Sequence, residues 1–272
     1  KCKANKIIGT NIDLDFPSVG ATENIILATV LSTGTTTINN AAMEPEIIDM
    51  VQFLKKMGAK IQGEGTNQII IDGVEKLSGV SYNIMPDRIE AGTILCAVAA
   101  TGGNVTLDNV MPEHLTAVIN KLEETGCKIE INNKKITLNA PKKLKSIDIK
   151  TMTYPGFPTD MQAIMGATLT VATGTSIIVE NIFESRYKYM IELQKMGAKI
   201  NIEGKTAIIK GVKKLYGAKV QATDLRGGAS LVLAGLVAKG TTNVENIEYI
   251  LRGYENLDGK LKNLGAEIYM IK

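Results

Sequence analysis

The chain has 272 residues, of which 44% are apolar, 22% are charged and 26 are glycine. This composition is typical of a globular protein with one large or two moderate domains, and it excludes a collagen, a coiled coil and a disordered chain. The 31 Lys and Arg residues nearly balance the 28 Asp and Glu residues, so the net charge of +3 does not predict a nucleic-acid binder.

Four similar phrases recur along the chain at intervals of about 70 residues, which is the length of a whole supersecondary unit. Each phrase contains a glycine that follows an amphipathic segment, and these glycines are Gly58, Gly126, Gly197 and Gly265. In the first unit, Ile47, Val51 and Leu54 lie at helical spacing just before the glycine. The repeat therefore predicts four related units.

Each unit is predicted to contain an apolar helix, over residues 21–33, 88–101, 160–173 and 225–239. Each of these helices is expected to end at a glycine, namely Gly34, Gly102, Gly174 and Gly240. A β-branched strand follows, then the amphipathic helix, then two short strands such as 199–202 and 207–210. We interpret the unit as βαβαββ, an α/β fold in which the apolar helices fill the centre and the sheets lie outside, as in an inside-out α/β barrel.

The last unit is expected to be incomplete, and the first unit is expected to lack the neighbouring units that would complete its domain. The fourth unit offers one strand, residues 268–272, after its second helix and has no hairpin partner, while residues 82–86 are the expected crossover between two domains. The chain also begins at Lys1 without an initiator Met. We expect residues 1–84 to form one unit of an incomplete domain and residues 85–272 to form three units that lack a closing N-terminal strand, within a longer two-domain protein.

Cysteine usage and hydropathy indicate a soluble, cytoplasmic protein. Cys2, Cys96 and Cys127 are far apart and show no metal-ligand spacing, which suits a reducing compartment. The longest apolar stretch, residues 229–238, is too short to span a membrane, and the first residues are not a signal peptide.

Aspartates precede three of the apolar helices: Asp87, Asp160 and Asp224. Taken singly, each is predicted to be a helix N-cap. At the equivalent place in the first unit, residues 16–21 form a Gly-containing helix start whose free backbone amides could bind a phosphate.

Three arginines lie near the beginnings of helices in units three and four: Arg186, Arg226 and Arg252. These arginines are either solvated or converge with Asp160 on one cleft. Such a cleft would bind a carboxylate or a phosphate, because arginine contacts these groups through two parallel hydrogen bonds. The single His114 is expected to be solvated. No metal-ligand set, Walker loop or dinucleotide fingerprint is present in the sequence, so no cofactor or metal is expected.

Four motifs, at residues 15–24, 85–90, 155–163 and 222–226, resemble the UDP-N-acetylglucosamine enolpyruvyl transferases (1-carboxyvinyltransferases) of the enolpyruvyl transferase family. The resemblance extends along the whole chain. It implies an inside-out α/β barrel fold with three βαβαββ units per domain, and domain closure during the reaction.

The resemblance also implies a reaction. The enolpyruvyl group of phosphoenolpyruvate would be transferred to the 3′-hydroxyl of UDP-N-acetylglucosamine with release of phosphate, which is the first committed step of peptidoglycan synthesis. Asp160, as the base, and Arg252 would be catalytic residues, and Arg252 would hold phosphoenolpyruvate together with Arg186 and Arg226. The sugar nucleotide would contact Ile182 and the run Phe16, Pro17, Ser18, Val19 and Gly20.

The chain departs from the family pattern at its N-terminal side. The Lys–Asn pair that binds phosphoenolpyruvate and the loop with the catalytic cysteine have no counterpart, and Cys96 lies inside an apolar helix. We therefore expect this chain alone to be inactive and to need an N-terminal fragment or a second chain. The alternative is a non-catalytic remnant that binds a nucleotide sugar or a partner protein; an RNA-end enzyme built from similar units fits neither the few aromatic residues nor the charge.

Overall fold

The computed structural model describes residue 4 and residues 6–271. The chain divides into two compact units, Lys1–Met85 with Thr153–Pro155, and Pro86–Met152 with Gly156–Lys272. Each unit has its own hydrophobic core. We call them the N-terminal and the C-terminal unit and describe each by itself.

The N-terminal unit is a single βαβαββ repeat. Its elements are β1 (Asn11–Asp13), α1 (Val19–Thr29), β2 (Thr35–Asn39), α2 (Pro45–Lys56), β3 (Lys60–Gln62) and β4 (Gln68–Asp72). The sheet has the order β1-β2-β4-β3, with β1 parallel to β2 and the other pairs antiparallel. Alternate residues of the strands, such as Ile69 and Ile71, pack against the helices and are fully buried.

The third repeat of the sequence has the same topology inside the C-terminal unit. It comprises β8 (Ile149–Lys150), the 3₁₀ turn η2 (Thr159–Met161), α5 (Gln162–Leu169), β9 (Thr175–Val179), α6 (Lys188–Lys195), β10 (Lys199–Glu203) and β11 (Thr206–Lys210). The strand order β10-β11-β9-β8 reproduces that of the N-terminal unit. The structure thus confirms the βαβαββ unit predicted from the repeat.

The other two repeats are less regular. The second has α3 (Arg88–Thr101), β5 (Asn104–Asp108), η1 (Pro112–His114), α4 (Thr116–Glu124), β6 (Lys128–Asn132) and β7 (Lys135–Asn139), in a three-stranded sheet of order β5-β7-β6. The fourth follows β12 (Leu215–Tyr216) and has β13 (Lys219–Gln221), α7 (Leu225–Val237), β14 (Ala238–Lys239), β15 (Asn243–Glu245), α8 (Glu248–Leu251) and α9 (Leu257–Asn263). The strand predicted at residues 268–272 is wrong within its described part, residues 268–271, because a strand requires a hydrogen-bonded partner and none lies beside it among the described residues.

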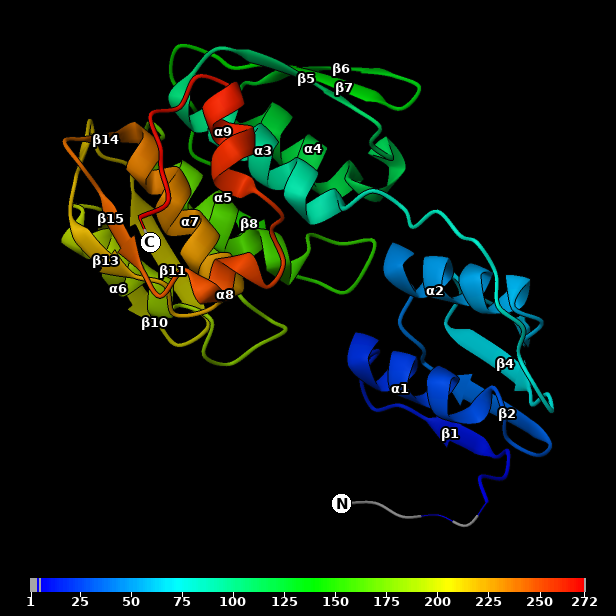
Figure 1. Ribbon diagram of the computed structural model, residues 1–272. Helices are drawn as coiled ribbons and strands as arrows, with labels where there is room; N and C mark the ends of the chain where they lie inside the picture. Colours follow the sequence, from blue (N-terminus) through cyan, green and yellow to red (C-terminus); the bar gives the residue numbers. More distant parts are fainter. Residues whose placement is uncertain (1–3, 5, 272) are drawn as a thin grey trace. The chain divides into compact units, whose positions relative to one another are not determined.

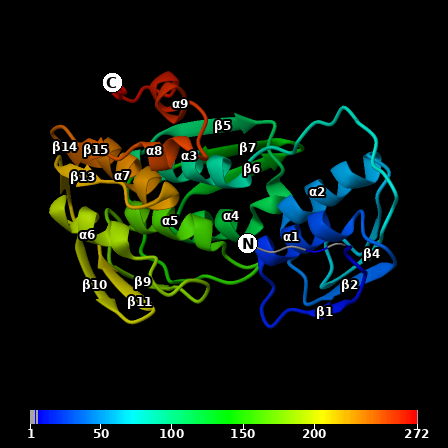
Figure 2. The same cartoon turned by 60° about the horizontal axis from the view of Figure 1, so that its bottom comes forward.

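The helices α3, α5 and α7 pack against one another at the centre of the C-terminal unit, with strands outside them (Figures 1 and 2). Every residue of α5 is buried, as its uniform hydrophobicity predicts. Close approach requires small residues here: a Cβ on Gly166 would lie 2.4 Å from the hydroxyl of Tyr189. Gly102 caps α3 directly, whereas α1, α5 and α7 end earlier than predicted, at Thr29, Leu169 and Val237.

The recurring glycine phrase has a physical cause. Gly58 follows α2 with φ of +105°, and the amide of Ala59 donates to the carbonyl of Leu54 at 3.0 Å, which satisfies a carbonyl at the helix end. The same bond closes the equivalent helices, from Cys127 to Leu122, from Ala198 to Leu193 and from Ala266 to Leu261. A residue with a Cβ rarely adopts this positive φ angle, so glycine recurs at each helix end.

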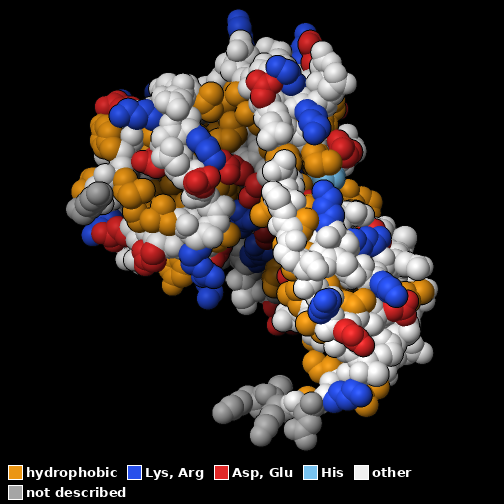
Figure 3. Space-filling view, turned by 45° about the vertical axis from the view of Figure 1, so that its right-hand side comes forward, with side chains coloured by type: hydrophobic (Ala, Val, Ile, Leu, Met, Phe, Trp, Pro, Cys, Tyr) orange, Lys and Arg blue, Asp and Glu red, His pale blue; other side chains and the backbone are white. Residues whose placement is uncertain are grey.

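Charged side chains of both signs are interspersed over the face shown in Figure 3. This distribution fits the near balance of charge in the sequence. Within the described part of the chain, no helix has both the length and the hydrophobicity needed to cross a membrane.

Candidate active site

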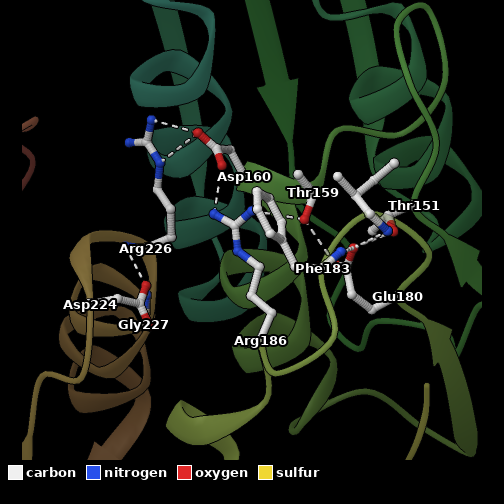
Figure 4. A network of polar contacts seen from close by, with 10 residues as sticks. Thr151, Thr159, Asp160, Glu180, Phe183, Arg186, Asp224, Arg226 and Gly227 are labelled. Carbon is white, nitrogen blue, oxygen red and sulfur yellow. Dashed lines mark hydrogen bonds and ion pairs between the residues drawn. The ribbon is translucent and has the colours of Figure 1, made fainter. Parts of the chain in front are cut away.

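Asp160 lies between two arginines of the C-terminal unit (Figure 4). Its Oδ1 accepts from Nη2 of Arg186 at 2.6 Å. Its Oδ2 accepts from Nε and Nη2 of Arg226 at 3.2 and 3.1 Å. The side chains of Arg186 and Arg226 are 16% and 11% exposed, whereas that of Asp160 is 38% exposed. The carboxylate therefore combines shielded ion pairs with access to solvent.

Three helix beginnings bring these residues together. Asp160 is in η2, just before α5; Arg186 is in the turn before α6; and Arg226 is in the first turn of α7. Asp224 is the N-cap of α7 and accepts from the amides of Arg226 and Gly227 at 3.0 and 2.8 Å, which fixes the backbone that carries Arg226.

The three aspartates divide into two groups. Asp87 and Asp224 are N-caps, as predicted. The N-cap prediction is wrong for Asp160, which makes no capping hydrogen bond and directs both carboxylate oxygens at arginines. The other sequence-based hypothesis, convergence of three arginines on Asp160, describes the observed positions of Arg186 and Arg226 but not that of Arg252.

The electrostatic balance at Asp160 favours its charged form. Burial by itself would raise the pKa of Asp160, but the nearby charges of Arg226 and Arg186 and their hydrogen bonds outweigh it, and the pKa is lowered from its ordinary value. The carboxylate is thus ionised at neutral pH and is a weak base for as long as both arginines hold it.

Aromatic rings support both guanidinium groups. The ring of Tyr254 lies 5.2 Å from the guanidinium carbon of Arg226, and the ring of Phe183 lies 4.9 Å from that of Arg186. Tyr254 is 1% exposed, and its hydroxyl is 2.8 Å from that of Thr93 on α3. Our sequence reading missed Tyr254, although its position two residues after Arg252 was a usable signal.

Arg226 also has an uncommitted donor. Its Nη1 is buried and makes no hydrogen bond of ordinary geometry to a described residue. Burial by itself would lower the pKa of Arg226, but its interactions with Tyr254 and Asp160 outweigh burial and raise it, so Tyr254 is a polar neighbour of this guanidinium. A buried charged donor without an acceptor is costly, so an anion placed at this position would gain a partner that the protein does not supply.

A second carboxylate, Glu180, lies on the side of Arg186 away from Arg226, next to Thr159 (Figure 4). It follows β9 and is 1% exposed. Its oxygens accept from the hydroxyls of Thr151 and Thr159 and from the amides of Ile182 and Phe183, at 2.8, 2.9, 2.8 and 3.2 Å. Sequence reasoning missed Glu180, because a single glutamate after a strand has no distinctive pattern.

The other predicted site residues are distributed as follows. Ile182 is half-buried in the turn that also carries Arg186. Arg252 is exposed at the end of α8 and forms no ion pair with a described residue. It is therefore outside the Asp160 cluster, although it is two residues from Tyr254 in the sequence.

The predicted nucleotide segment lies in the N-terminal unit. Phe16 is 46% exposed, and Ser18 is the N-cap of α1, its hydroxyl accepting from the amide of Ala21 at 3.3 Å. Pro17 and Val19 are half-buried and Gly20 is exposed. The helix start is therefore formed and accessible in this unit, with one of its amides already satisfied by Ser18.

Cysteine chemistry is absent from the described site. Cys96 and Cys127 are buried, and burial raises the pKa of the Cys96 thiol to about 12. Cys2 lies outside the described residues. Within the described ranges, no group of three or more His, Cys, Asp or Glu side chains could hold a metal ion.

Comparison with known proteins agrees with this fold. The family model for EPSP synthase (3-phosphoshikimate 1-carboxyvinyltransferase) matches residues 1–261. The chain belongs to this family of carboxyvinyl (enolpyruvyl) transferases.

Among curated relatives, the chain is 54% identical over 269 residues to UDP-N-acetylglucosamine 1-carboxyvinyltransferase 1 of Caldanaerobacter subterraneus, covering 99% of this chain and 65% of that protein. It is 52% identical over 267 residues to UDP-N-acetylglucosamine 1-carboxyvinyltransferase 2 of Bacillus cereus, covering 98% and 62%. The chain thus spans just under two thirds of the length of these relatives.

Solved structures agree on the fold. The enolpyruvyl transferase NikO from Streptomyces tendae superposes with a TM-score of 0.87 at 26% identity, over 98% of this chain and 66% of that one. EPSP synthase from Acinetobacter baumannii gives a TM-score of 0.71 at 21% identity, over 96% and 63%, which supports the fold alone. The inside-out α/β fold class inferred from the repeats and the resemblance is confirmed by these neighbours.

Proposed function

We propose that the complete protein transfers the enolpyruvyl group of phosphoenolpyruvate to the 3′-hydroxyl of UDP-N-acetylglucosamine and releases phosphate, in the cytoplasm, as the first committed step of peptidoglycan synthesis. The observation that carries the proposal is the placement of Asp160 between Arg186 and Arg226. The named relatives support the choice of substrates.

The proposed chemistry is an addition followed by an elimination. Asp160 accepts the proton of the sugar 3′-hydroxyl while the 3′-oxygen of the sugar bonds to C2 of phosphoenolpyruvate. C3 of phosphoenolpyruvate gains a proton from an acid outside the described site. The resulting tetrahedral ketal then loses a proton from C3, and the bond from C2 to the phosphate oxygen breaks, so that phosphate leaves. Arg186, Arg226 and Arg252 hold the carboxylate and phosphate and stabilise the charge that develops on them.

The low pKa of Asp160 has a role in this scheme. With both arginines bound to it, Asp160 is a poor base. When the anionic groups of the substrate accept some of the arginine hydrogen bonds in place of Asp160, the charged form of Asp160 is stabilised less. Asp160 then becomes more basic. Substrate binding and base activation are thereby coupled, and Nη1 of Arg226 is available for the first contact.

The remaining substrate contacts are assigned by motif. Ile182 and the segment from Phe16 to Gly20 contact the sugar nucleotide, with the accessible amides at the start of α1 facing its diphosphate.

We further propose that the 272-residue chain needs a partner, either the N-terminal portion present in longer relatives or a second chain. The exposed apolar side chains of Leu27 in α1 and Leu31 in the turn after it support this requirement, because they are 55% and 56% exposed, whereas the equivalent helix α5 of the C-terminal unit is buried.

The test measures phosphate release with both substrates. We expect none from the isolated chain, and release from the chain complemented with the N-terminal third of the Caldanaerobacter relative, dependent on both substrates and lost in Asp160→Asn. Intact mass of the purified protein, with a search for a co-purifying N-terminal polypeptide, establishes which sample is assayed. A folded, complemented protein that binds UDP-N-acetylglucosamine without releasing phosphate would be the non-catalytic remnant instead, and turnover by the verified isolated chain would refute the need for a partner.

A further inference from the structure

Glu180 and Thr159 connect two loops of the candidate site. Thr159 is adjacent to Asp160 in η2. Glu180 follows β9 directly, at the beginning of the turn that carries Ile182 and Arg186. The Thr159 hydroxyl donates to Oε2 of Glu180 at 2.9 Å and accepts from Nη1 of Arg186 at 2.8 Å. A side chain of each loop is thus bound to a side chain of the other.

The direction of these hydrogen bonds is determined by chemistry. A carboxylate can only accept, and a guanidinium can only donate. The single proton of the Thr159 hydroxyl is therefore committed to Glu180, and a lone pair faces Arg186. Nη2 of the same guanidinium donates to Asp160, so Thr159 and Asp160 hold Arg186 as a pair.

The other oxygen of Glu180 holds the turn itself. It accepts from the amides of Ile182 and Phe183 and from the hydroxyl of Thr151. Thr151 in turn accepts from the amide of Asn181 at 2.9 Å, so the turn is fixed on both sides. All four donors to Glu180 are neutral, which shows that this buried carboxylate serves geometry rather than the pairing of a charge.

We propose that Glu180 is a positioning residue for the candidate active site: through the Thr159 hydroxyl it orients the guanidinium of Arg186 towards Asp160 and towards the substrate anion. The inference rests on the proposed function for its role in turnover. The orientation of Arg186 can be tested without turnover.

Glu180→Gln is the informative variant because it keeps the shape and changes the donor pattern. At the position of Oε1 the glutamine NH₂ would face three hydrogen-bond donors, whereas at the position of Oε2 it would face only the Thr159 hydroxyl. The NH₂ group is therefore expected to take the position of Oε2 and to face Thr159. The Thr159 hydroxyl then has to accept a hydrogen bond from the glutamine amide, and the hydroxyl proton loses its acceptor. The lone pair of the hydroxyl is therefore no longer fixed on Arg186.

The first readout is the carboxyl ¹³C titration of Asp160 in the full 272-residue chain, assigned with Asp160→Asn. Glu180→Gln and Thr159→Val are expected to raise the titration midpoint of Asp160 towards its ordinary value, because Arg186 is held less firmly beside it. Thr159→Ser, which keeps the hydroxyl, should restore the wild-type midpoint. Glu192→Gln is the matched control: Glu192 is 8% exposed, accepts from Lys195 and lies outside the site, so its variant should leave the midpoint unchanged.

Two outcomes would overturn the inference. An unchanged Asp160 midpoint in a folded Glu180→Gln chain would show that Glu180 only stabilises the turn. If Glu180→Gln does not fold, equal midpoints in Thr159→Val and Thr159→Ser would have the same meaning.

The second readout is kinetic, in the complemented protein. Glu180→Gln should raise KM for phosphoenolpyruvate about tenfold, as expected for one weakened charge-assisted hydrogen bond, with a smaller effect on kcat. Absence of turnover in the wild-type complemented protein would refute the proposed function, whereas an unchanged KM beside a working wild type would refute the role of Glu180.

Discussion

Arg226 lies 66 residues after Asp160 and directs two nitrogens, Nε and Nη2, at one of its carboxylate oxygens. The pair joins the beginning of α7 to the beginning of α5, two helices that pack side by side in the C-terminal unit. The contact therefore depends on the packing of two repeats, and it leaves the second oxygen of Asp160 for Arg186.

Replacement of Asp160 separates its chemical role from its structural one. Asp160→Asn leaves two shielded guanidinium groups without a counter-charge, and we expect the free energy of unfolding to fall by about 1–2 kcal/mol, less than for a fully buried pair because the side chain is 38% exposed. In the complemented protein, turnover should fall at least about 100-fold. Asp87→Asn is the control, since asparagine also caps a helix, and should leave both quantities near the wild-type values. Unchanged turnover in Asp160→Asn would remove Asp160 from the chemistry.

The pH dependence of stability should reveal the ion pairs of Asp160. Because the folded-state pKa of Asp160 is lowered from its ordinary value of 3.8, its stabilisation is complete above that ordinary value and disappears as the pH falls through the folded-state pKa. We expect the difference in unfolding free energy between wild type and Asp160→Asn to be constant near neutral pH and to shrink in acid. Chemical denaturation from pH 7 downwards measures it. A difference that persists or grows in acid would contradict the lowered pKa.

Arg252→Lys should separate binding from folding. Arg252 is exposed and forms no ion pair with a described residue, so the substitution should leave the unfolding free energy within about 0.5 kcal/mol of wild type. Use of phosphoenolpyruvate in the complemented protein should be impaired, because a point charge does not replace a bidentate guanidinium. Steady-state kinetics of the Arg252→Lys protein that match those of the wild type would exclude Arg252 from substrate binding.

The cap of α1 predicts a local loss of stability. Ser18→Ala removes the acceptor of the Ala21 amide and should lower the unfolding free energy by about 1 kcal/mol. Ser18→Asp, which can still cap the helix, should restore it. Thermal or chemical unfolding monitored by circular dichroism compares the three proteins, and a Ser18→Ala protein as stable as the wild type would show that the cap contributes little.

The described cysteines should be unreactive in the folded chain. Burial raises the pKa of Cys96 to about 12 and also raises the pKa of Cys127, so neither is a thiolate near neutral pH. Maleimide labelling followed by peptide mapping should modify both residues only after denaturation. Rapid labelling of Cys96 in the native protein would mean that α3 is far less protected than its packing indicates.

Much of the fold follows from the local pattern. The glycines after the second helices, the amphipathic spacing in α2 and the uniform hydrophobicity of α5 each have a local physical cause, and each appears where predicted. The final strand was not predictable in this way. Residues 268–271 have strand-like composition, but a strand exists only where a neighbour supplies the hydrogen bonds.

The sequence by itself determined the repeated βαβαββ unit, the inner and outer helices and the residue types of the site, because periodicity, capping and side-chain chemistry are local properties. Only the tertiary structure decided that Asp87 and Asp224 cap helices whereas Asp160, in a similar sequence context, pairs with arginines. The same holds for Tyr254 under Arg226 and for Glu180 behind Thr159. These roles depend on which side chains from distant repeats meet in space, and that is settled by the packing of α5 against α7 and of β9 beside its neighbouring strands.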